Sequence, residues 1–420
     1  MSSPLKHYKL GELCRVKHGW PFQGEYFSDE GERVVLTPAN FFEEGGFKRV
    51  LGKEKYYHGD FPEEYLCAKG DLIVVMTQQA EGLLGSTALV PEDGVYLHNQ
   101  RIGLITHNEE LVDKQFLYYL FMTSSVRKQL RNSASGTKVK HTSPEKIYDV
   151  DVYIPDITIQ RKSAKFLSYI DEKLRVNNSI LSRLEQMSDT LYNYWFVQFD
   201  FPCKEGKPYS SSGKEMVWCE ELSKDIPVGW NVADLNTLMS ISTSAVNPKT
   251  YKETVFEHYS IPAFDAECYP VFENGDCIES NKYIVSPDSI LVSKLNPQFK
   301  RLWDPFCVTE NAICSTEFIV FNPLEVWKRP YCYALMNSDE FYSHMVAKAV
   351  SSTGSRKRIQ PNVSASFRVA MPPDDIIEAF CHKYKPLLSK QKQIKIENQK
   401  LKRIKQWLLP LLMNGQATIE

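Results

Sequence analysis

The longest regular pattern in the chain lies between Ile157 and Phe196, a stretch without proline or glycine in which apolar side chains recur at heptad spacing. Such spacing predicts a helix with one continuous apolar face. At 1.5 Å per residue the helix reaches roughly 60 Å, so it needs a partner along its length. Polar residues within such a face usually fix the register of a helix pair at some cost in stability. The predicted pairing face contains Leu167, Ile170, Leu174, Leu181, Leu184, Leu191 and Trp195, with Asn177 and Ser188 as its polar positions.

A second helix with the same periodicity is predicted from Asp374 to Met413. An offset of 217 residues brings the two apolar faces into phase and carries Asn177 onto Ile394. The second face is more polar along one side, because it includes Gln391, Asn398 and Lys405. Its apolar positions are Phe380, Leu387, Ile394, Leu401 and Leu408.

The similarity between the two halves extends upstream of both helices. The loop SGTKVKHTSP at residues 135–144 corresponds to STGSRKRIQP at residues 352–361. Each loop is followed by a short apolar strand that ends at proline, VDVYIP in the first copy and FRVAMPP in the second. Earlier in each copy, GDLIVVMTQ and PDSILVSKLN are predicted to be buried strands that follow a turn. The chain is therefore predicted to be a tandem duplication.

The duplication predicts an α+β fold in which a strand-rich globular α/β body of about 150 residues precedes each long helix. A few shorter helices are predicted within the first body, one of them from Asp113 to Arg131. The predicted parts are a first body at residues 1–156, a central helix at 157–203, a polar connector at 204–216, a second body at 217–373, and a C-terminal helix and tail at 374–420.

Composition places the chain among soluble globular proteins, with 43% hydrophobic and 24% charged residues. No apolar run approaches the roughly 18 residues that cross a bilayer, and the N-terminus lacks an apolar signal core, so we expect a cytoplasmic protein. The ten cysteines are scattered without a CxxC pair, which predicts neither disulfides nor a zinc site. The formal net charge of −2 does not by itself indicate a nucleic-acid partner.

The distribution of charge is more informative than its sum. Residues 114–144 contain no acid but several basic residues, and residues 341–373 repeat this arrangement in the second copy. Arg, Lys, Gln and Asn can contact DNA phosphates and base edges. A solvated basic surface is the alternative, which recurrence in both copies makes less favourable. The candidate DNA-binding residues are Gln78, Gln79, Lys138, Lys140 and His141 in the first copy, and Lys294, Lys300, Arg301, Arg356, Lys357 and Arg358 in the second.

Motifs for catalysis are absent from the sequence. It has no GxGxxG or GxxxxGK[ST] loop to hold a nucleotide, no GxSxG elbow and no HExxH helix. The segment Asn296-Pro297-Gln298-Phe299 partly matches the [ND]PP[FY] motif of amino-methyltransferases, but Gln298 replaces the second proline and no cofactor loop precedes it. We therefore expect a chain without an active site, cofactor or metal.

The helix blocks and the loops before them resemble the specificity subunit of type I restriction-modification systems. The blocks are YIPDITIQRKSAKFLSYIDEKLRVNNSILSRLEQMSDTLYNYWFVQFDF and MPPDDIIEAFCHKYKPLLSKQKQIKIENQKLKRIKQWLLPLLMNGQ. The segments GTKVKHTSP, TGSRKRIQP and LGELCRVKHG agree with the same pattern, so the resemblance covers nearly the whole chain. The family's proline-proline-acidic-Gln opening is reduced before Gln160, and Glu378 stands where the second copy should have Gln.

The resemblance implies a non-catalytic DNA-recognition subunit. Each body would be a target-recognition domain for one half of an asymmetric bipartite site in double-stranded DNA. The two long helices would pack antiparallel as a spacer, give the chain an internal pseudo-twofold, and dock two adenine methyltransferase subunits. S-adenosylmethionine and ATP would be bound by the methyltransferase and by restriction or translocase subunits, not by this chain.

Two other classes of protein remain open at this point. The chain could be a self-contained DNA methyltransferase or nuclease fused to recognition domains, although the absence of motifs argues against this. It could instead be a coiled-coil scaffold protein whose helices serve only for association.

Overall fold

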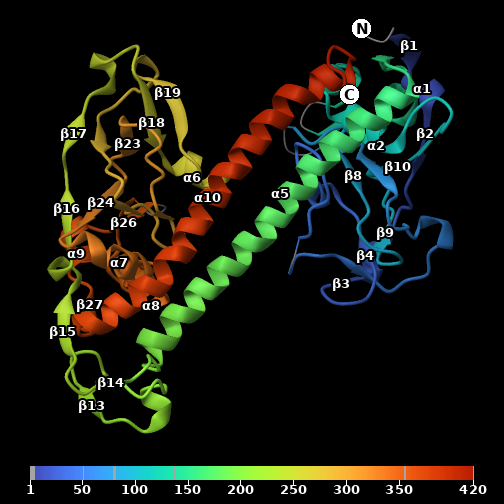
Figure 1. Ribbon diagram of the computed structural model, residues 1–420. Helices are drawn as coiled ribbons and strands as arrows, with labels where there is room; N and C mark the ends of the chain where they lie inside the picture. The colour runs from blue at the N-terminus through green and yellow to red at the C-terminus, as the bar shows by residue number, and fades with distance from the viewer. Residues whose placement is uncertain (1–4, 51, 79–81, 137–138, 354–355, 420) are drawn as a thin grey trace. The chain divides into compact units, whose positions relative to one another are not determined.

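The computed structural model describes residues 5–50, 52–78, 82–136, 139–353 and 356–419. The chain forms two compact units, one made of residues 1–175 and 400–420 and the other of residues 176–399. Each unit contains a β-rich body and a part of each long helix (Figure 1). The α+β fold predicted from the sequence is confirmed. None of the helices in the described ranges has the length and apolarity to cross a membrane.

The first unit is built on a four-stranded antiparallel sheet in the order β2-β10-β6-β8. A second sheet has the order β3-β5-β4-β9, and β4 and β9 run parallel. Strand β1 pairs with β12, and β7 with β11. The strands are β1 (Lys6–Lys9), β2 (Cys14–His18), β3 (Phe27–Ser28), β4 (Val34–Val35), β5 (Tyr56–Tyr57), β6 (Leu72–Val75), β7 (Thr77–Gln78), β8 (Thr87–Leu89), β9 (Tyr96–Leu97), β10 (Ile102–His107), β11 (Lys140–His141) and β12 (Asp151–Ile154), and the helices before α5 are α1 (Leu10–Leu13), α2 (Lys114–Met122), α3 (Ser124–Ser133) and α4 (Pro144–Tyr148).

Strand β6 lies between two apolar cores, which explains its uninterrupted apolar sequence. Leu72 and Val74 face the core that includes α2 and the start of α5, whereas Ile73 and Val75 face the core beneath the second sheet. Alternate residues of a strand point to opposite faces, so a strand covered on both sides must be apolar throughout. The equivalent strand of the second unit, β21 (Ile290–Ser293), divides its side chains between two cores in the same way.

The second unit repeats this arrangement. Its antiparallel sheet has the order β16-β24-β21-β22, β15 pairs with β27, and a five-stranded sheet has the order β17-β20-β23-β18-β19. Its strands are β13 (Met216–Cys219), β14 (Lys224–Pro227), β15 (Asn231–Asp234), β16 (Met239–Ser242), β17 (Ala245–Val246), β18 (Val255–Tyr259), β19 (Val271–Asn274), β20 (Lys282–Ile284), β21 (Ile290–Ser293), β22 (Leu302–Trp303), β23 (Ala312–Ser315), β24 (Phe318–Pro323), β25 (Val350–Thr353), β26 (Arg356–Arg358) and β27 (Arg368–Met371), and its helices before α10 are α6 (Ile261–Glu267), α7 (Arg329–Met336), α8 (Asp339–Lys348) and α9 (Pro361–Ala365).

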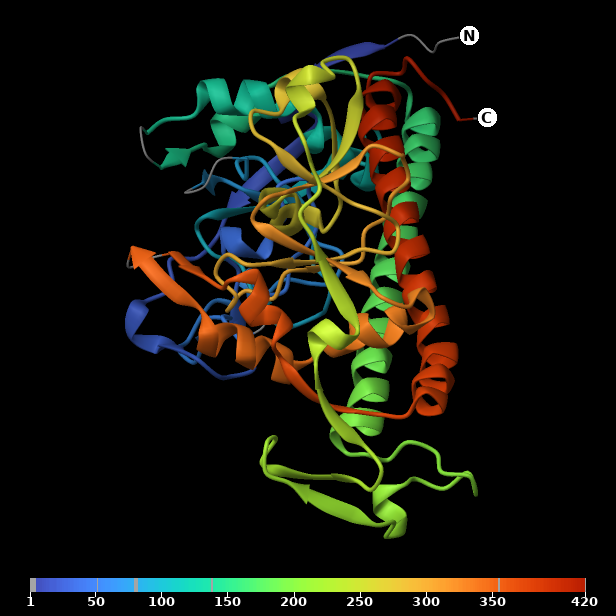
Figure 2. The ribbon, with the colours of Figure 1, turned by 90° about the vertical axis from the view of Figure 1, so that its left-hand side faces the viewer.

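The elements of the two units correspond in order, as expected of a tandem duplication. Sheet β2-β10-β6-β8 matches β16-β24-β21-β22, and each unit then has a helix pair, a short helix and a strand that leads into its long helix. The second sheet of each unit, β3-β5-β4-β9 in the first and β17-β20-β23-β18-β19 in the second, differs in size and strand order. The hairpin β13–β14 has no counterpart in the described part of the first unit, and Figure 2 shows it beyond the end of α5.

One helix prediction in the first body is wrong. The single helix expected from Asp113 to Arg131 is two helices, α2 and α3, separated at Thr123. Thr123 leaves the helical conformation, and its side chain accepts a hydrogen bond from the Val126 amide as the N-cap of α3. Ser338 has the same role between α7 and α8.

The two long helices confirm the sequence pattern. Helix α10 spans Asp374–Met413, as predicted. Helix α5 spans Ile157–Tyr192 and continues into a π-helical turn at Asn193–Val197, so its predicted end at residue 203 is wrong. The chain leaves the helix there because Phe199 adopts a left-handed conformation with φ +59°. Within each unit the two helices lie side by side (Figure 1; Figure 2). None of the predicted pairing residues is exposed. Leu167, Ile170, Asn177, Phe380 and Ile394 are buried, and Leu174, Leu181, Leu184, Leu191, Leu387, Leu401 and Leu408 are half-buried.

Polar side chains on the pairing faces bond to one another across the helix pair of the second unit. The Asn177 side-chain amide donates to Asn398 Oδ1 over 2.9 Å and to Glu397 Oε2 over 2.9 Å. Further along, the Gln391 side-chain amide donates to Ser188 Oγ over 2.9 Å. Residue numbers rise on α5 as they fall on α10, so the helices are antiparallel.

These contacts select one register for the pair. Asn177 contacts Asn398 rather than its repeat counterpart Ile394. In the first unit Lys405 forms an ion pair with Asp171, which also accepts a hydrogen bond from the Tyr119 hydroxyl over 2.7 Å. We refer to the pairs Asp171–Lys405, Asn177–Asn398 and Ser188–Gln391 as the polar ladder.

Candidate nucleic-acid interface

The basic loop of the first unit lies against the strand that follows β6. Strand β11 pairs with β7, which places Lys140 opposite Gln78 and His141 opposite Thr77. Thr77 Oγ1 lies 3.0 Å from His141 Nδ1. The loop before β11 turns tightly, because Gly136 has φ +97° and a Cβ there would lie 2.0 Å from the Val139 carbonyl oxygen. Only glycine fits this position, which accounts for the glycine in the sequence motif.

Not every candidate of the first unit faces solvent. His141 is exposed and Lys140 half-buried, and neither forms an ion pair within the described ranges. Gln78 is 7% exposed, and its Oε1 accepts a hydrogen bond from the Leu84 amide over 2.7 Å. In this conformation the buried Gln78 side chain therefore stabilises the segment around Leu84 and does not face solvent. Gln79 and Lys138 lie outside the described residues.

Arg127 also belongs to the acid-free stretch, but it stabilises the fold of the first body and does not face solvent. Its guanidinium is buried and donates hydrogen bonds to the carbonyl oxygens of Gly82, Leu84 and Glu43 over 2.7–2.9 Å. Burial lowers the pKa of Arg127 to about 10. The sequence pattern could not distinguish this buried arginine from the exposed lysines around it.

The basic segment of the second unit is a hairpin formed by β25 and β26. It is joined to the end of β21, since Leu295 bridges to Arg358 and the Ile359 amide donates to the Lys294 carbonyl over 3.1 Å. Arg356 and Lys357 are exposed on β26. Lys294, at the end of β21, therefore lies directly beside the basic hairpin.

Three candidates of the second unit are held by acidic partners that the sequence did not reveal. Arg301 makes two hydrogen bonds to Asp265 over 2.7 and 2.8 Å, and its side chain is 12% exposed. Arg358 makes two to Glu317 over 3.1 and 3.0 Å. Lys300 lies 3.9 Å from Asp339. Arg358 belongs to β26 itself, and Lys300 and Arg301 lie between β21 and β22. In this conformation all three have acidic partners.

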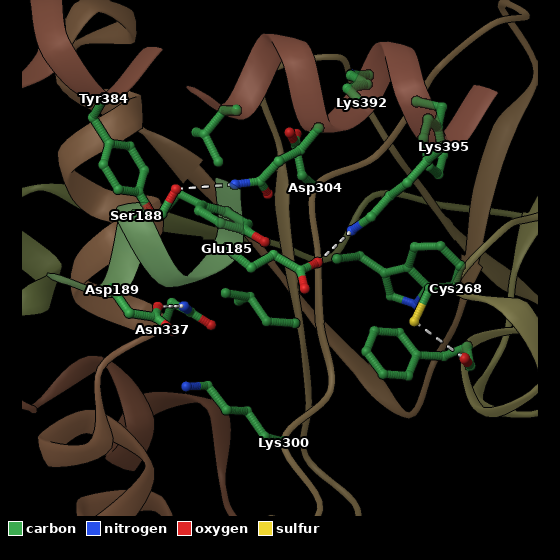
Figure 3. A pocket seen from close by; sticks show the side chains of 17 residues that line it. Glu185, Ser188, Asp189, Cys268, Lys300, Asp304, Asn337, Tyr384, Lys392 and Lys395 are labelled. Carbon is green, nitrogen blue, oxygen red and sulfur yellow. Dashed lines mark hydrogen bonds and ion pairs between the residues drawn. The ribbon is translucent and has the colours of Figure 1, made fainter. Parts of the chain in front are cut away.

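A pocket within the second unit lies between its body and its parts of α5 and α10 (Figure 3). The charged residues that line it are Glu185, Asp189, Lys300, Asp304, Lys392 and Lys395. Lys395 lies 3.6 Å from Glu185, and the Asn337 side chain donates to Asp189 over 3.0 Å. Burial raises the pKa of Asp189. Because these charges have protein partners, the pocket is a joint between body and helices rather than an obvious ligand site.

The described residues contain no group of three or more His, Cys, Asp or Glu side chains that could hold a metal ion. The described residues offer DNA one basic element in each unit, with half-buried Lys140 and exposed His141 in the first and exposed Arg356 and Lys357 in the second. Each follows the second helix of a helix pair and lies at the end of the central buried strand. Such elements suit contacts with phosphates and base edges.

An exposed apolar stripe on α5 was missed by the sequence reasoning. Val176, Ile180 and Met187 on α5, and Tyr194 in the π-helical turn that follows it, are between 37% and 55% exposed. Their spacing of four, seven and seven residues places them on one side of the helix, about 100° around it from the pairing face. The signal was present as a second apolar periodicity beside the stronger one.

Comparisons with known proteins agree with these features. The family model of the type I restriction modification DNA specificity domain matches residues 3–186. The type I restriction enzyme MjaIX specificity subunit of Methanocaldococcus jannaschii is 24% identical over 356 residues, which cover 80% of this chain and 72% of that protein. The HindI specificity subunit of Haemophilus influenzae is 22% identical over 384 residues, covering 76% of this chain and 81% of that one.

A solved structure shares the fold. The crystal structure of the type I restriction-modification S subunit from M. genitalium superposes with a TM-score of 0.62 at 15% identity. The match covers 98% of this chain and 96% of that one.

Proposed function

We propose, from the premise that the chain belongs to the specificity-subunit family of type I restriction-modification systems, that each of its two bodies reads one half of a bipartite DNA target. As a member of that family it is a non-catalytic subunit, which recognises the DNA target for the methyltransferase and restriction complex. The observation that carries the proposal is the recurrence of a basic element at the same place in both units.

The residues proposed to contact DNA differ between the units. In the first they are Lys140 and His141, together with Lys138 and Gln79 outside the described residues. In the second they are Arg356, Lys357 and Lys294. Gln78, Lys300, Arg301 and Arg358 are proposed to support these elements.

The target is proposed to be asymmetric. The sheet β3-β5-β4-β9 of the first unit has four strands, whereas its counterpart β17-β20-β23-β18-β19 in the second unit has five, and the basic residues beside these sheets differ. Different surfaces present different donors to the grooves, so the two half-sites should differ in sequence. The antiparallel helix pair is proposed as the spacer between them, since half-site spacing follows the geometry of the protein.

The partners are proposed to be two methyltransferase subunits, together with restriction or translocase subunits. The apolar stripe on α5 supports one methyltransferase site, because several exposed apolar residues on one side of a helix are typical of protein interfaces. S-adenosylmethionine and ATP are proposed to bind those partners, since the sequence of this chain has no nucleotide-binding loop. The complex would act in the cytoplasm.

Genome-wide mapping of adenine methylation, in cells with and without the gene for this chain, tests the proposal. We expect a bipartite motif that disappears with the gene. Arg356→Ala should alter methylation through one half-site and Lys140→Ala through the other. Lys207→Ala, which removes an exposed charge from the connector, is the matched control. A motif that is unchanged when both basic elements are neutralised would contradict the proposal.

The helix stripe needs a separate test. Met187→Glu places a charge at the most exposed apolar position of the stripe, and co-purification with the methyltransferase subunit measures assembly. We expect weaker assembly, whereas Gln186→Glu, one residue away and outside the stripe, should leave it unchanged. Equal assembly of both variants would contradict the assignment of the α5 stripe to the methyltransferase interface.

A further inference from the structure

The segment that partly matched a methyltransferase motif has a different structural role. Asn296 has φ +50°, a left-handed conformation that asparagine tolerates better than most residues. The Phe299 amide donates to the Asn296 carbonyl over 2.9 Å, so residues 296–299 form a turn. Gln298 and Phe299 are exposed on this turn, and Phe299 is 55% exposed.

Asn296 fastens this turn to the basic hairpin. Its amide donates to the Lys357 carbonyl over 2.7 Å, and its Oδ1 accepts a hydrogen bond from the Lys357 amide over 3.0 Å. The side chain thereby supplies the acceptor that a backbone carbonyl provides in a strand. Together with the bridge from Leu295 to Arg358, these bonds join turn and hairpin into one unit.

Gln298 and Phe299 are the exposed side chains at the tip of the turn, because the neighbouring Arg301 is directed to an acidic partner. Arg301 bonds to Asp265, and its guanidinium carbon lies 5.1 Å from the centre of the Phe299 ring. A glutamine amide can pair with the edge of adenine in the major groove. A phenylalanine can contact a thymine methyl group or enter a base step.

We propose that Asn296 is a positioning residue for DNA reading by the second unit. It holds Gln298 and Phe299 on the same element as Arg356 and Lys357, so that the four side chains meet one half-site together. This inference rests on the proposed function and adds to it the residues that select bases. Gln298 and Phe299 would read base edges beside a base contact from Arg356, and Lys357 would contact phosphate.

Methylation mapping of cells that carry Asn296→Ala in the complete complex tests the proposal. We expect methylation of the wild-type motif to fall about fivefold or more, as for one lost base contact. Sites with substitutions should appear in only one half of the motif, the half that Arg356→Ala affects. Ser223→Ala is the matched control, because Ser223 also has a positive φ, of 52°, but lies in the turn of the β13–β14 hairpin.

Two further variants separate positioning from folding. Asn296→Asp keeps the Oδ1 acceptor and should retain the slow hydrogen exchange of the Lys357 amide, which Asn296→Ala should lose. Phe299→Ala alters an exposed side chain, so it should fold normally and still relax the same half of the motif.

The outcomes distinguish this inference from the function on which it rests. If Arg356→Ala changes the motif while Asn296→Ala and Phe299→Ala do not, the positioning role is wrong and the proposed function stands. If neutralising the hairpin also changes nothing, the assignment of the hairpin to DNA reading fails first. Relaxation of both halves by Asn296→Ala would indicate a general structural defect and overturn the inference.

Discussion

The starts of α5 and α10 occupy equivalent places in the repeat but are fastened by different interactions. Gln160 in α5 is fully buried, and its side chain donates to the carbonyls of Leu111 and Pro155 and accepts from the Asp113 amide over 2.9–3.1 Å. Asp113 is the N-cap of α2, so this amide ties the long helix to the first helix pair of its body.

Helix α10 is tied to its body by charge instead. Lys328, at the N-cap of α7, forms an ion pair with Asp374 over 2.8 Å and another with Glu325. Asp374 is 67% exposed, and Glu378, which stands near the position of Gln160, is exposed and lies 4.0 Å from His382. A joint between long helix and helix pair is thus present in both units, made by a buried neutral side chain in the first and by a half-exposed ion pair in the second. The two joints should respond differently to mutation, pH and salt.

Gln160→Ala should give the largest effect. The substitution leaves the Asp113 amide and two carbonyls buried without partners, and we expect a loss of about 3 kcal/mol in unfolding free energy. Denaturant unfolding measures it. Gln186→Ala, on the exposed surface of α5, is the control and should cost under about 0.5 kcal/mol. Equal losses of unfolding free energy for the two variants would contradict a stabilising role of the buried Gln160 amide.

Acidification should lower the stability of the first unit, because a buried histidine there is neutral in the folded chain. His98 is fully buried, its Nε2 lies 2.8 Å from the Ile102 carbonyl, and burial lowers its pKa to about 4, with smaller contributions from Lys17 and His18. The unfolded chain takes up this proton near pH 6.5 and the folded chain only near pH 4. Stability from this group is therefore complete above pH 6.5 and falls between pH 6.5 and 4, by about 2 kcal/mol at pH 5.

The second unit contains a buried histidine with a different environment. Burial lowers the pKa of His258, but its Nδ1 lies 2.6 Å from Glu273 Oε1, which opposes the shift. Denaturant unfolding from pH 7 to 5 should show a flatter pH dependence for His98→Gln than for the wild type, and His258→Gln should differ less from it. Parallel curves for wild type and His98→Gln would contradict the assignment.

The Asn177–Asn398 pair tests whether a buried neutral pair in the helices behaves like Gln160. Asn398→Leu leaves Asn177 without one partner and Asn178 without its bond from Asn398, and should cost about 1–2 kcal/mol. Adding Asn177→Leu should recover most of the loss, because two apolar residues can pack where two amides bonded. A double-mutant cycle in denaturant measures the coupling. Additive losses would show that the amides act independently.

Lys328→Ala should have the smallest effect. Because Asp374 is largely exposed, solvent screens the ion pair and we expect at most about 1 kcal/mol. The loss should shrink as salt is raised, whereas that of Gln160→Ala should not. A cost for Lys328→Ala that is equal at low and high salt would assign it to packing of the lysine stem rather than to charge.

The parts of the fold that follow from local periodicity could be predicted from the sequence. Helix α10 has the predicted bounds around its heptad pattern, and β6 is predictable because it is apolar throughout. The break between α2 and α3 was missed because Thr123 could be either a helix interior residue or a cap. Only the tertiary environment selects the cap.

The candidate interface was predictable only in part, for a similar reason. An acid-free run identifies basic residues, but the acids that neutralise them come from distant segments, as Asp265 does for Arg301 and Glu317 for Arg358. Burial of Gln78 likewise depends on Leu84, which the strand pattern does not place. Asn296 belongs to a partial motif in the sequence, but its hydrogen bond to Lys357 joins residues that are remote in sequence.

The polar ladder also limits how the long helices can change in evolution. One inserted residue in α5 between Asn177 and Ser188 would turn every later side chain by about 100° and remove Ser188 from Gln391. Seven inserted residues would leave only about 20° of rotation, yet they would still need a matching insertion in α10 for the later pairs to meet. Length changes that preserve the ladder are therefore paired and come in steps of about two helical turns. Under the proposed function, lineages of this protein would acquire new target spacings by discrete jumps rather than by gradual drift.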